Sequence, residues 1–207
     1  MAISILNKQN LHITSSSAIQ GGSFSKNGRL LFEDRQTPDI VQLLINAYKH
    51  FAIDYPRFYK MDSLCKLGLL ATEILLQDAG LMQKYKPEEV ALCLCNASSS
   101  LDTDKKYYHT IAEMASPALF VYTLPNIVIG EICIRHGFKG ENLFLIENEL
   151  DEAFLKRQAT LLLQPAGTKA CIYGWVELLG NSYNAVVYLM EKNDAAEGIT
   201  FTPEKND

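Results

Sequence analysis

The chain has 207 residues, of which 48% are hydrophobic and 21% are charged, and its formal net charge is -5. This composition is ordinary for a globular protein, and the length suffices for one well-cored domain. An acidic chain with scattered Lys and Arg residues offers no field for polyanions, so nucleic acid is not expected as a partner. No stretch approaches the roughly eighteen apolar residues of a membrane helix, and the N-terminus lacks a signal-peptide core. We therefore expect a cytoplasmic protein without a membrane partner.

Five cysteines, each embedded in apolar sequence, indicate reduced core thiols rather than a disulfide framework. They are Cys65, Cys93, Cys95, Cys133 and Cys171. A strand would place Cys93 and Cys95 on one face, as two metal ligands require. No second Cys or His pair at zinc spacing accompanies them, and the four histidines are far apart in the sequence. We predict no metal site and no other cofactor.

The N-terminal part predicts a strand, a loop and a helix. Residues 2–14 have the composition of a first strand, whereas residues 15–28 are rich in Ser and Gly and predict a loop. Thr37 and Pro38 supply a capping hydroxyl and a proline at the first helical position. A single apolar face that continues to Phe51 then predicts a packing helix.

Residues 58–81 give the strongest helix signal in the chain. Their apolar side chains recur at helical spacing, with Asp62 or Ser63 as the N-cap and Gly80 as the terminator. The apolar run of residues 89–95 then predicts a buried strand.

A polar turn and a further helix follow that strand. Residues 98–100 are three serines, which would cap a helix predicted over residues 102–114. No G-x-S-x-G elbow surrounds these serines, so a serine nucleophile is disfavoured. Tyr107, Tyr108 and His109 are expected to form an amphipathic surface or interface on that helix.

The chain is organised around residues 116–154. Residues 125–137 predict a helix that ends at a glycine, and Gly140 turns the chain into the next element. The uninterrupted apolar run of residues 143–146 is typical of a strand buried on both faces. Carboxylates within residues 147–152 then begin another helix, which suits the positive end of its dipole.

The C-terminal part predicts a β-hairpin and a tail. Residues 169–179 and 183–190 are two strands in this interpretation, joined by the polar turn of residues 180–182. Residues 192–207 are charged and poor in apolar side chains, and we expect them to be disordered.

Several of these stretches resemble the β-ketoacyl-ACP synthases of the thiolase superfamily. Residues 124–126, residues 137–140 and the apolar strand follow that family's path from a P-N helix start through G-x-x-G-P to the strand before its nucleophilic cysteine. Residues 174–177 resemble its A-G-G-x-E motif, and the whole resemblance covers residues 58–191. The helix motif F-x-x-M-D-x-x-x-x-L-x-L-x-A-A-x-x-A-L-x-D-A-G-L is matched at Phe58, Met61, Asp62, Leu67, Leu69, Ala71, Asp78, Ala79, Gly80 and Leu81.

The resemblance implies that the family's catalytic groups are missing. The position of the family cysteine, nine residues after Gly140, is held by Glu149. The H-G-T and N-x-x-G-x-x-G-H-N motifs, which bring two histidines in the family's second half, do not occur. Because Claisen condensation needs a thiolate to hold the acyl chain, we expect no condensing activity. A simpler explanation of Glu149 is a first-turn acid, worth about 0.3 to 1 kcal/mol.

The resemblance also implies the fold. We expect an α/β protein with a layered mixed sheet of about five strands and helices on both faces, equivalent to half of a thiolase-like fold. Residues 1–191 would form a single domain and residues 192–207 the tail. Without a second half, a helix layer that full-length members bury would need a cover.

The first functional hypothesis is a non-catalytic accessory protein of fatty-acid or polyketide-type acyl chain synthesis. It is similar in this respect to chain-length-factor subunits, which lack the cysteine and pair with an active synthase. The family dimerises through the strand before the cysteine, so we expect a homodimer or a heterodimer with a full-length β-ketoacyl-ACP synthase. The interface residues would be Leu143, Phe144, Leu145 and Ile146. Acyl carrier protein is a further candidate partner, although the sequence shows no basic patch for it.

The second hypothesis is a small enzyme that processes acyl thioesters, such as a decarboxylase or thioesterase. Glu149 would act as the base, with help from Glu147 or His136, because two close carboxylates can split their pKa values.

Overall fold

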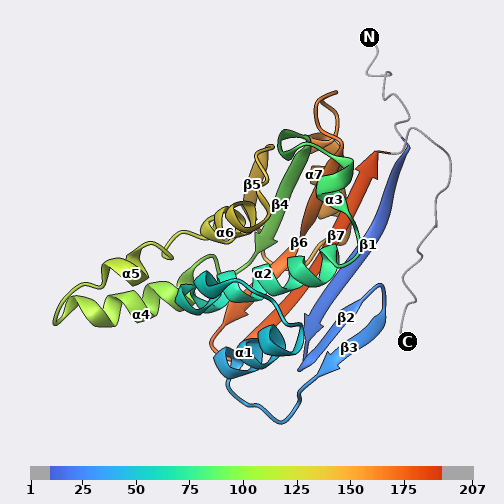
Figure 1. The fold of residues 1–207 in the computed structure, drawn as a ribbon. Helices are drawn as coiled ribbons and strands as arrows, with labels where there is room; N and C mark the ends of the chain where they lie inside the picture. The colour runs from blue at the N-terminus through green and yellow to red at the C-terminus, as the bar shows by residue number, and fades with distance from the viewer. Residues whose placement is uncertain (1–9, 193–207) are drawn as a thin grey trace.

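The computed structural model describes residues 10–192, which form one seven-stranded mixed sheet with helices on both faces (Figure 1). The strand order is β3-β2-β1-β7-β6-β4-β5. β4 is parallel to β5 and β6, and all other neighbours are antiparallel. The strands are β1 Leu11–Gln20, β2 Ser23–Lys26, β3 Arg29–Glu33, β4 Val90–Asn96, β5 Asn142–Ile146, β6 Ala170–Leu179 and β7 Ser182–Lys192.

Two hydrophobic clusters hold the helices, one on each face of the sheet. The larger cluster includes side chains of α1, α2 and α6, and the smaller one lies under α7. The most enclosed helix is α2, in which twelve of fourteen residues are buried. The helices are α1 Ile40–His50, α2 Ser63–Leu76, α3 Leu81–Lys84, α4 Leu101–Ile111, α5 Pro117–Phe120, α6 Ile127–His136 and α7 Glu152–Leu162, with short 3-10 helices η1 Pro56–Lys60 and η2 Pro87–Glu89.

The prediction of about five strands is wrong because residues 15–28 are not a loop. They complete β1 and form β2, and β3 follows directly. Buried serines explain the error. Ser15 Oγ donates to the carbonyl oxygen of Leu75 at 3.0 Å, and Ser17 Oγ donates to that of Ala71 at 2.7 Å. A serine-rich composition predicts exposed side chains. Here the hydrogen bonds to α2 satisfy the serine hydroxyl groups, so these side chains can be buried. Residues 2–9 of the predicted first strand lie outside the described residues.

The helix predicted over residues 58–81 is divided into η1, α2 and α3. Asp62 is the N-cap of α2 and accepts a hydrogen bond from the backbone N–H of Cys65 at 2.8 Å, so one of the two predicted caps is confirmed. Gly80 does not terminate α2, which ends at Leu76, but precedes α3 in a left-handed conformation. At α1 the cap is Asp39 rather than the predicted Thr37.

The predicted strands around the parallel part of the sheet are confirmed, with one correction. β4 is buried along its whole length, as its apolar run predicts. β5, however, is the edge strand and is only half-buried, with β4 as its single neighbour. An apolar run indicates that the side chains of a strand are buried, but it does not indicate whether the strand has one neighbouring strand or two. The sheet therefore ends at the strand that the sequence predicted as fully enclosed.

Two glycines of the family-like motifs stand where backbones approach closely. A Cβ atom on Gly140 would lie 2.3 Å from the carbonyl oxygen of Val90, and one on Gly174 would lie 2.2 Å from that of Val186. Gly140 thereby allows the chain to enter β5 beside β4, and Gly174 lets β6 pair with β7. The predicted hairpin of β6 and β7 is confirmed, with Gly180 and Asn181 as its turn.

The expectation that an apolar helix layer needs a cover stays a prediction for α7. In residues 10–192 this is the one helix on its face of the sheet, and it buries Leu155 and Ala159. Its outward side carries the exposed charged groups Glu152, Lys156 and Arg157. Leu161 on the same helix is 49% exposed, so the outward side of α7 is charged but leaves one large apolar side chain in water.

None of the helices in residues 10–192 has the length and apolar character needed to span a bilayer. Apart from Lys192, which belongs to β7, the predicted tail lies outside the described residues.

Candidate functional site

The carboxyl ends of the three parallel strands bring together polar groups from distant parts of the chain. Asn96 ends β4, Glu147 follows β5, and Glu177 lies near the end of β6. The backbone N–H of Glu147 donates to the carbonyl oxygen of Asn96 at 3.0 Å, which continues the pairing of the two strands. This edge is where open α/β sheets place their ligands, so it is the first candidate site.

A backbone anion site at this edge is filled by the protein itself. One carboxylate oxygen of Glu177 accepts hydrogen bonds from the N–H groups of Ala97 at 2.6 Å and Ser98 at 3.1 Å. The side chain of buried Asn96 bonds both backbone groups of Ser99 and fixes the loop. Consecutive N–H groups of this kind stabilise anions, and here an internal carboxylate already occupies them. Before the structure, only the resemblance of residues 174–177 to the A-G-G-x-E motif singled out Glu177.

Glu149 is placed differently from the sequence prediction. The N-cap of α7 is Asp151, whose carboxylate accepts from the N–H of Phe154 at 2.9 Å, and the first-turn acid is Glu152. Glu149 therefore precedes the helix and is exposed.

The predicted helper His136 is not part of the same cluster. It lies in the last turn of α6, where its ring stacks on Phe138 and its Nε2 is 3.4 Å from a carboxylate oxygen of Glu73. Burial lowers the pKa of His136, and Glu73 opposes this shift. The C-terminal end of α6 leads into the start of β5, whereas Glu149 follows its other end. The structure therefore gives no support to an acid-base pair of these two residues.

The five cysteines are not activated nucleophiles. Burial raises the pKa of Cys95 to about 11, with Glu147 and Glu177 adding to the shift, and raises that of Cys93 to about 12. Burial also raises the pKa of each remaining thiol, namely Cys65, Cys133 and Cys171. Thiols with such values are protonated near neutral pH.

Cys93 and Cys95 lie on the α7 face of the sheet, as their spacing predicted. Within residues 10–192, no group of three or more His, Cys, Asp or Glu side chains is placed to hold a metal ion.

The predicted interface strand β5 has an open edge. Two hydrogen bonds mark where it pairs with β4. The N–H of Leu92 donates to the carbonyl oxygen of Glu141, and the N–H of Glu147 donates to the carbonyl oxygen of Asn96. Because backbone groups alternate along a parallel strand, Phe144 and its even-numbered neighbours turn their N–H and C=O groups away from β4. Leu143 and Leu145 pack on the α7 side, Phe144 packs on the α2 side, and Ile146 is 51% exposed.

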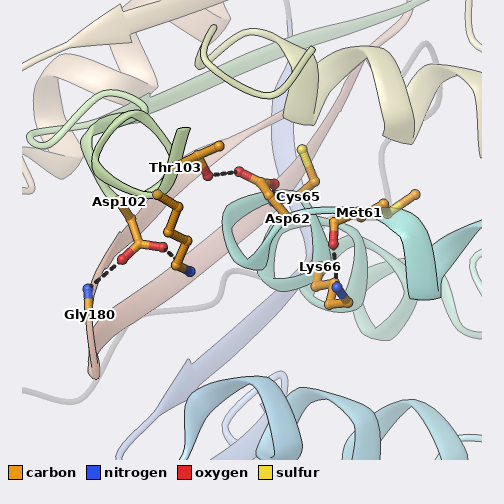
Figure 2. A network of polar contacts seen from close by, with 8 residues as sticks. Met61, Asp62, Cys65, Lys66, Asp102, Thr103 and Gly180 are labelled. Atoms are coloured by element: carbon orange, nitrogen blue, oxygen red, sulfur yellow. Dashed lines mark hydrogen bonds and ion pairs between the residues drawn. The ribbon is translucent and has the colours of Figure 1, made fainter. Parts of the chain in front are cut away.

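A polar network that the sequence patterns did not predict fixes the start of α4 (Figure 2). The carboxylate of Asp62, besides capping α2, accepts from Thr103 Oγ1 at 2.6 Å. The carboxylate of Asp102 accepts from the N–H of Gly180 at 2.9 Å and from Lys106 at 2.7 Å. The first turn of α4 is thereby joined to α2 and to the β6–β7 turn. In the sequence, the M-D motif had singled out Asp62, but only as part of the α2 pattern and not as a contact to α4.

A groove of about 500 Å³ lies between η1 and the α5 region. Buried Glu131 joins two of the lining residues, since it accepts from Arg57 at 2.8 and 3.0 Å and from the hydroxyl of Tyr122 at 3.1 Å. Lys60 adds a second, exposed cation. The groove is lined by Pro56, Arg57, Lys60, Ala118, Val121 and Tyr122.

No protein-family profile matches the sequence, and no curated protein is significantly similar to it. Solved structures share its fold. The ishigamide ketosynthase/chain length factor has 16% identity over 91% of this chain and 63% of its own, with a TM-score of 0.65. The ketosynthase ApeO in complex with its chain length factor ApeC, from Xenorhabdus doucetiae, has 15% identity, coverage of 88% and 79%, and a TM-score of 0.58. AntDE:AntF, a type II PKS acyl-carrier protein in complex with its ketosynthase, has 14% identity, coverage of 88% and 62%, and a TM-score of 0.62.

These likenesses define the class of fold. The chain has the thiolase-like α/β fold of ketosynthases and chain length factors, which confirms the resemblance inferred from the sequence motifs. It spans less than two thirds of the ishigamide and AntDE:AntF chains, at 63% and 62% of their lengths. At such low identity the likeness concerns the fold alone.

Proposed function

We propose that this chain is a non-catalytic ketosynthase-like subunit of fatty-acid or polyketide-type acyl chain synthesis. It acts by associating with a chain of the same fold, either a second copy or a full-length β-ketoacyl-ACP synthase. The observation that carries the proposal is the open, uncharged edge of β5, which ends in exposed Ile146. The ketosynthase ApeO, which is in complex with its chain length factor ApeC, supports a partnership of this kind.

The chemistry of the candidate site supports a role without condensation. An acyl-carrying nucleophile must be activated by a base or a lowered pKa, and burial raises the pKa of all five thiols. Glu149, at the position of the family nucleophile, is a solvated carboxylate. The backbone N–H groups of Ala97 and Ser98, which would suit an oxyanion, are occupied by Glu177.

The physics of sheet edges supports association through β5. An unpaired strand presents a row of N–H and C=O groups that another strand can bond, and proteins usually guard such edges with charges or a bulge. Residues 142–146 contain no charged side chain. Pairing of two such strands across a two-fold axis would satisfy these groups and cover Ile146.

The test compares two exposed apolar residues on opposite edges of the sheet. Ile146→Asp on β5 should weaken association by about tenfold or more, because it places a charge in the paired region. Leu30→Asp on β3 is the matched control, since Leu30 is 52% exposed and Ile146 is 51% exposed. The measurements are native mass over a concentration series and co-purification from the natural host. If both variants associate as strongly as the parent protein does, the proposal is wrong.

Acyl carrier protein is a second candidate partner, favoured by the groove beside η1. Carrier proteins are acidic, and the groove offers the cations Arg57 and Lys60 beside an apolar wall. AntDE:AntF is an acyl-carrier protein in complex with its ketosynthase. Lys60→Glu should weaken binding of a carrier protein and reduce its salt dependence, whereas Lys49→Glu, in the last turn of α1, should not. Equal titration curves for both variants would remove this partner.

A further inference from the structure

The polar side of the groove between η1 and the α5 region is held in place by a buried carboxylate. The side chain of Glu131 is 2% exposed and pairs side-on with Arg57, whose Nε lies 2.8 Å from Oε2 and whose Nη2 donates to Oε1 at 3.0 Å. The hydroxyl of Tyr122 donates to the same Oε1 at 3.1 Å. Burial and the charge of Glu131 raise the pKa of Tyr122, so this hydroxyl keeps its proton. The guanidinium of Arg57 is therefore oriented before any ligand binds.

Arg57 retains donors that can meet a ligand. A guanidinium carries five N–H groups, and the side-on pair with Glu131 uses two of them. The side chain of Arg57 is 48% exposed, so the remaining N–H groups are accessible from the groove. Lys60 lines the same groove and is exposed as well. Two cations and one buried carboxylate leave these three groups with one net positive charge, which a single negative charge on a ligand would balance.

The other lining residues of the groove are apolar. They are Pro56, Ala118, Val121 and the ring of Tyr122. Val121 is 50% exposed, so covering it with hydrocarbon would remove apolar surface from water. The groove has a volume of about 500 Å³, which is within the range of small-molecule sites. A ligand that complements this lining has one anionic end and an apolar body.

We propose that this groove binds a free medium-chain carboxylate, with the carboxylate between Arg57 and Lys60 and the hydrocarbon chain along Val121 and Tyr122. The inference rests on the proposed function, because acyl chain synthesis supplies such chains, and it deepens that function by naming a ligand for the groove.

Charge complementarity is the reason to name a carboxylate as the anion. A carboxylate carries one negative charge near neutral pH and presents two oxygens in a plane, which matches the planar N–H groups of Arg57. A phosphate monoester carries about 1.5 to 2 negative charges, more than the single net positive charge of Arg57, Lys60 and Glu131 balances.

The experiment measures binding of sodium octanoate to the full chain by isothermal titration calorimetry, near neutral pH and below the concentration at which octanoate forms micelles. Saturable binding at one site is expected. Acetate, which lacks the chain, and 1-octanol, which lacks the charge, should each bind about tenfold more weakly or less.

Two pairs of variants at exposed positions locate the ligand. Lys60→Gln removes a cation of the groove and should weaken octanoate binding by about two- to fivefold, whereas Lys49→Gln, in the last turn of α1, should not. Val121→Asp places a negative charge on the apolar wall and should weaken binding by about tenfold or more. Met114→Asp is its control, since Met114 is 81% exposed and does not line the groove.

The outcomes separate the ligand of the groove from the proposed function. If octanoate does not saturate, or if Val121→Asp binds it as well as Met114→Asp does, octanoate only coats exposed apolar surface and the groove is not its site. Tighter binding of octyl phosphate than of octanoate overturns the choice of a carboxylate. Neither result changes the association of Ile146→Asp and its parent, which tests the proposed function separately. A chain that binds octanoate in the groove but associates with no chain of its fold supports the site and overturns the proposed function.

Discussion

The two edge strands of the sheet, β3 and β5, differ in how they meet solvent. β3 begins with Arg29 and ends with Glu33, and Glu33 forms an ion pair with Arg35 at 2.8 Å. β5 has no charged residue, and its last residue is exposed isoleucine. Charges discourage a further strand from pairing with an edge, and their absence permits it. The difference shows that the β3 edge carries charges that hinder a further strand and that the β5 edge does not, which supports the proposed association at β5.

A similar contrast separates α7 from residues 101–124. α7 presents Lys156 and Arg157 to solvent and exposes one large apolar side chain, Leu161, whereas residues 101–124 expose several, among them Tyr108, Ile111 and Met114. The exposed apolar surface is therefore greater on residues 101–124 than on α7.

The largest effect is expected from breaking the approach of β5 to the sheet. Gly140→Ala would place a Cβ atom 2.3 Å from the backbone oxygen of Val90, which cannot move away without disturbing β4. We expect a loss of about 3 kcal/mol in the free energy of unfolding, measured by denaturant titration. Gly130→Ala on α6 is the control, since its Cβ meets open space and the change should stabilise the helix by about 0.5 to 1 kcal/mol. Similar stabilities for the two variants would contradict this view of Gly140.

A smaller effect is expected from pH on the helix beside β5. Because burial lowers the pKa of His136, the unfolded chain binds more protons than the folded one just below the unfolded pKa of about 6.5. The free energy of unfolding should therefore fall as the pH drops through this value. His136→Gln should reduce that slope, whereas His109→Gln on exposed α4 serves as the control. A His136→Gln slope that matches the parent protein would exclude this contribution.

The smallest effect is expected at the β3 edge. Glu33→Gln removes the ion pair with Arg35, but both side chains are exposed, so the free energy of unfolding should change by less than about 1 kcal/mol. Native mass is the more informative measurement. Removing the charge of Glu33 from the β3 edge should leave the oligomeric state unchanged, because Arg29 still places a charge on this edge. New association of Glu33→Gln would show that this single charge keeps the edge closed.

The sequence alone determined the features that follow from local periodicity and close packing. The apolar runs of β4, β5, β6 and β7, the helical spacing of α2 and α6, and the glycines at 140 and 174 all point to the thiolase-like fold. These signals are readable because a buried face has a fixed period, and because a glycine is required wherever two backbones nearly touch.

Only the tertiary structure decided what depends on neighbours distant in the sequence. Ser15 and Ser17 can lie in a buried strand because their hydroxyl groups donate hydrogen bonds to carbonyl oxygens of α2. Composition cannot show that these acceptors lie nearby. Glu177 occupies the N–H groups of Ala97 and Ser98 across some eighty residues of chain. The open edge of β5 was likewise invisible, since an apolar run has the same pattern at the centre and at the edge of a sheet. Position in the sheet is a property of the assembled fold, because it depends on which strands pair with one another.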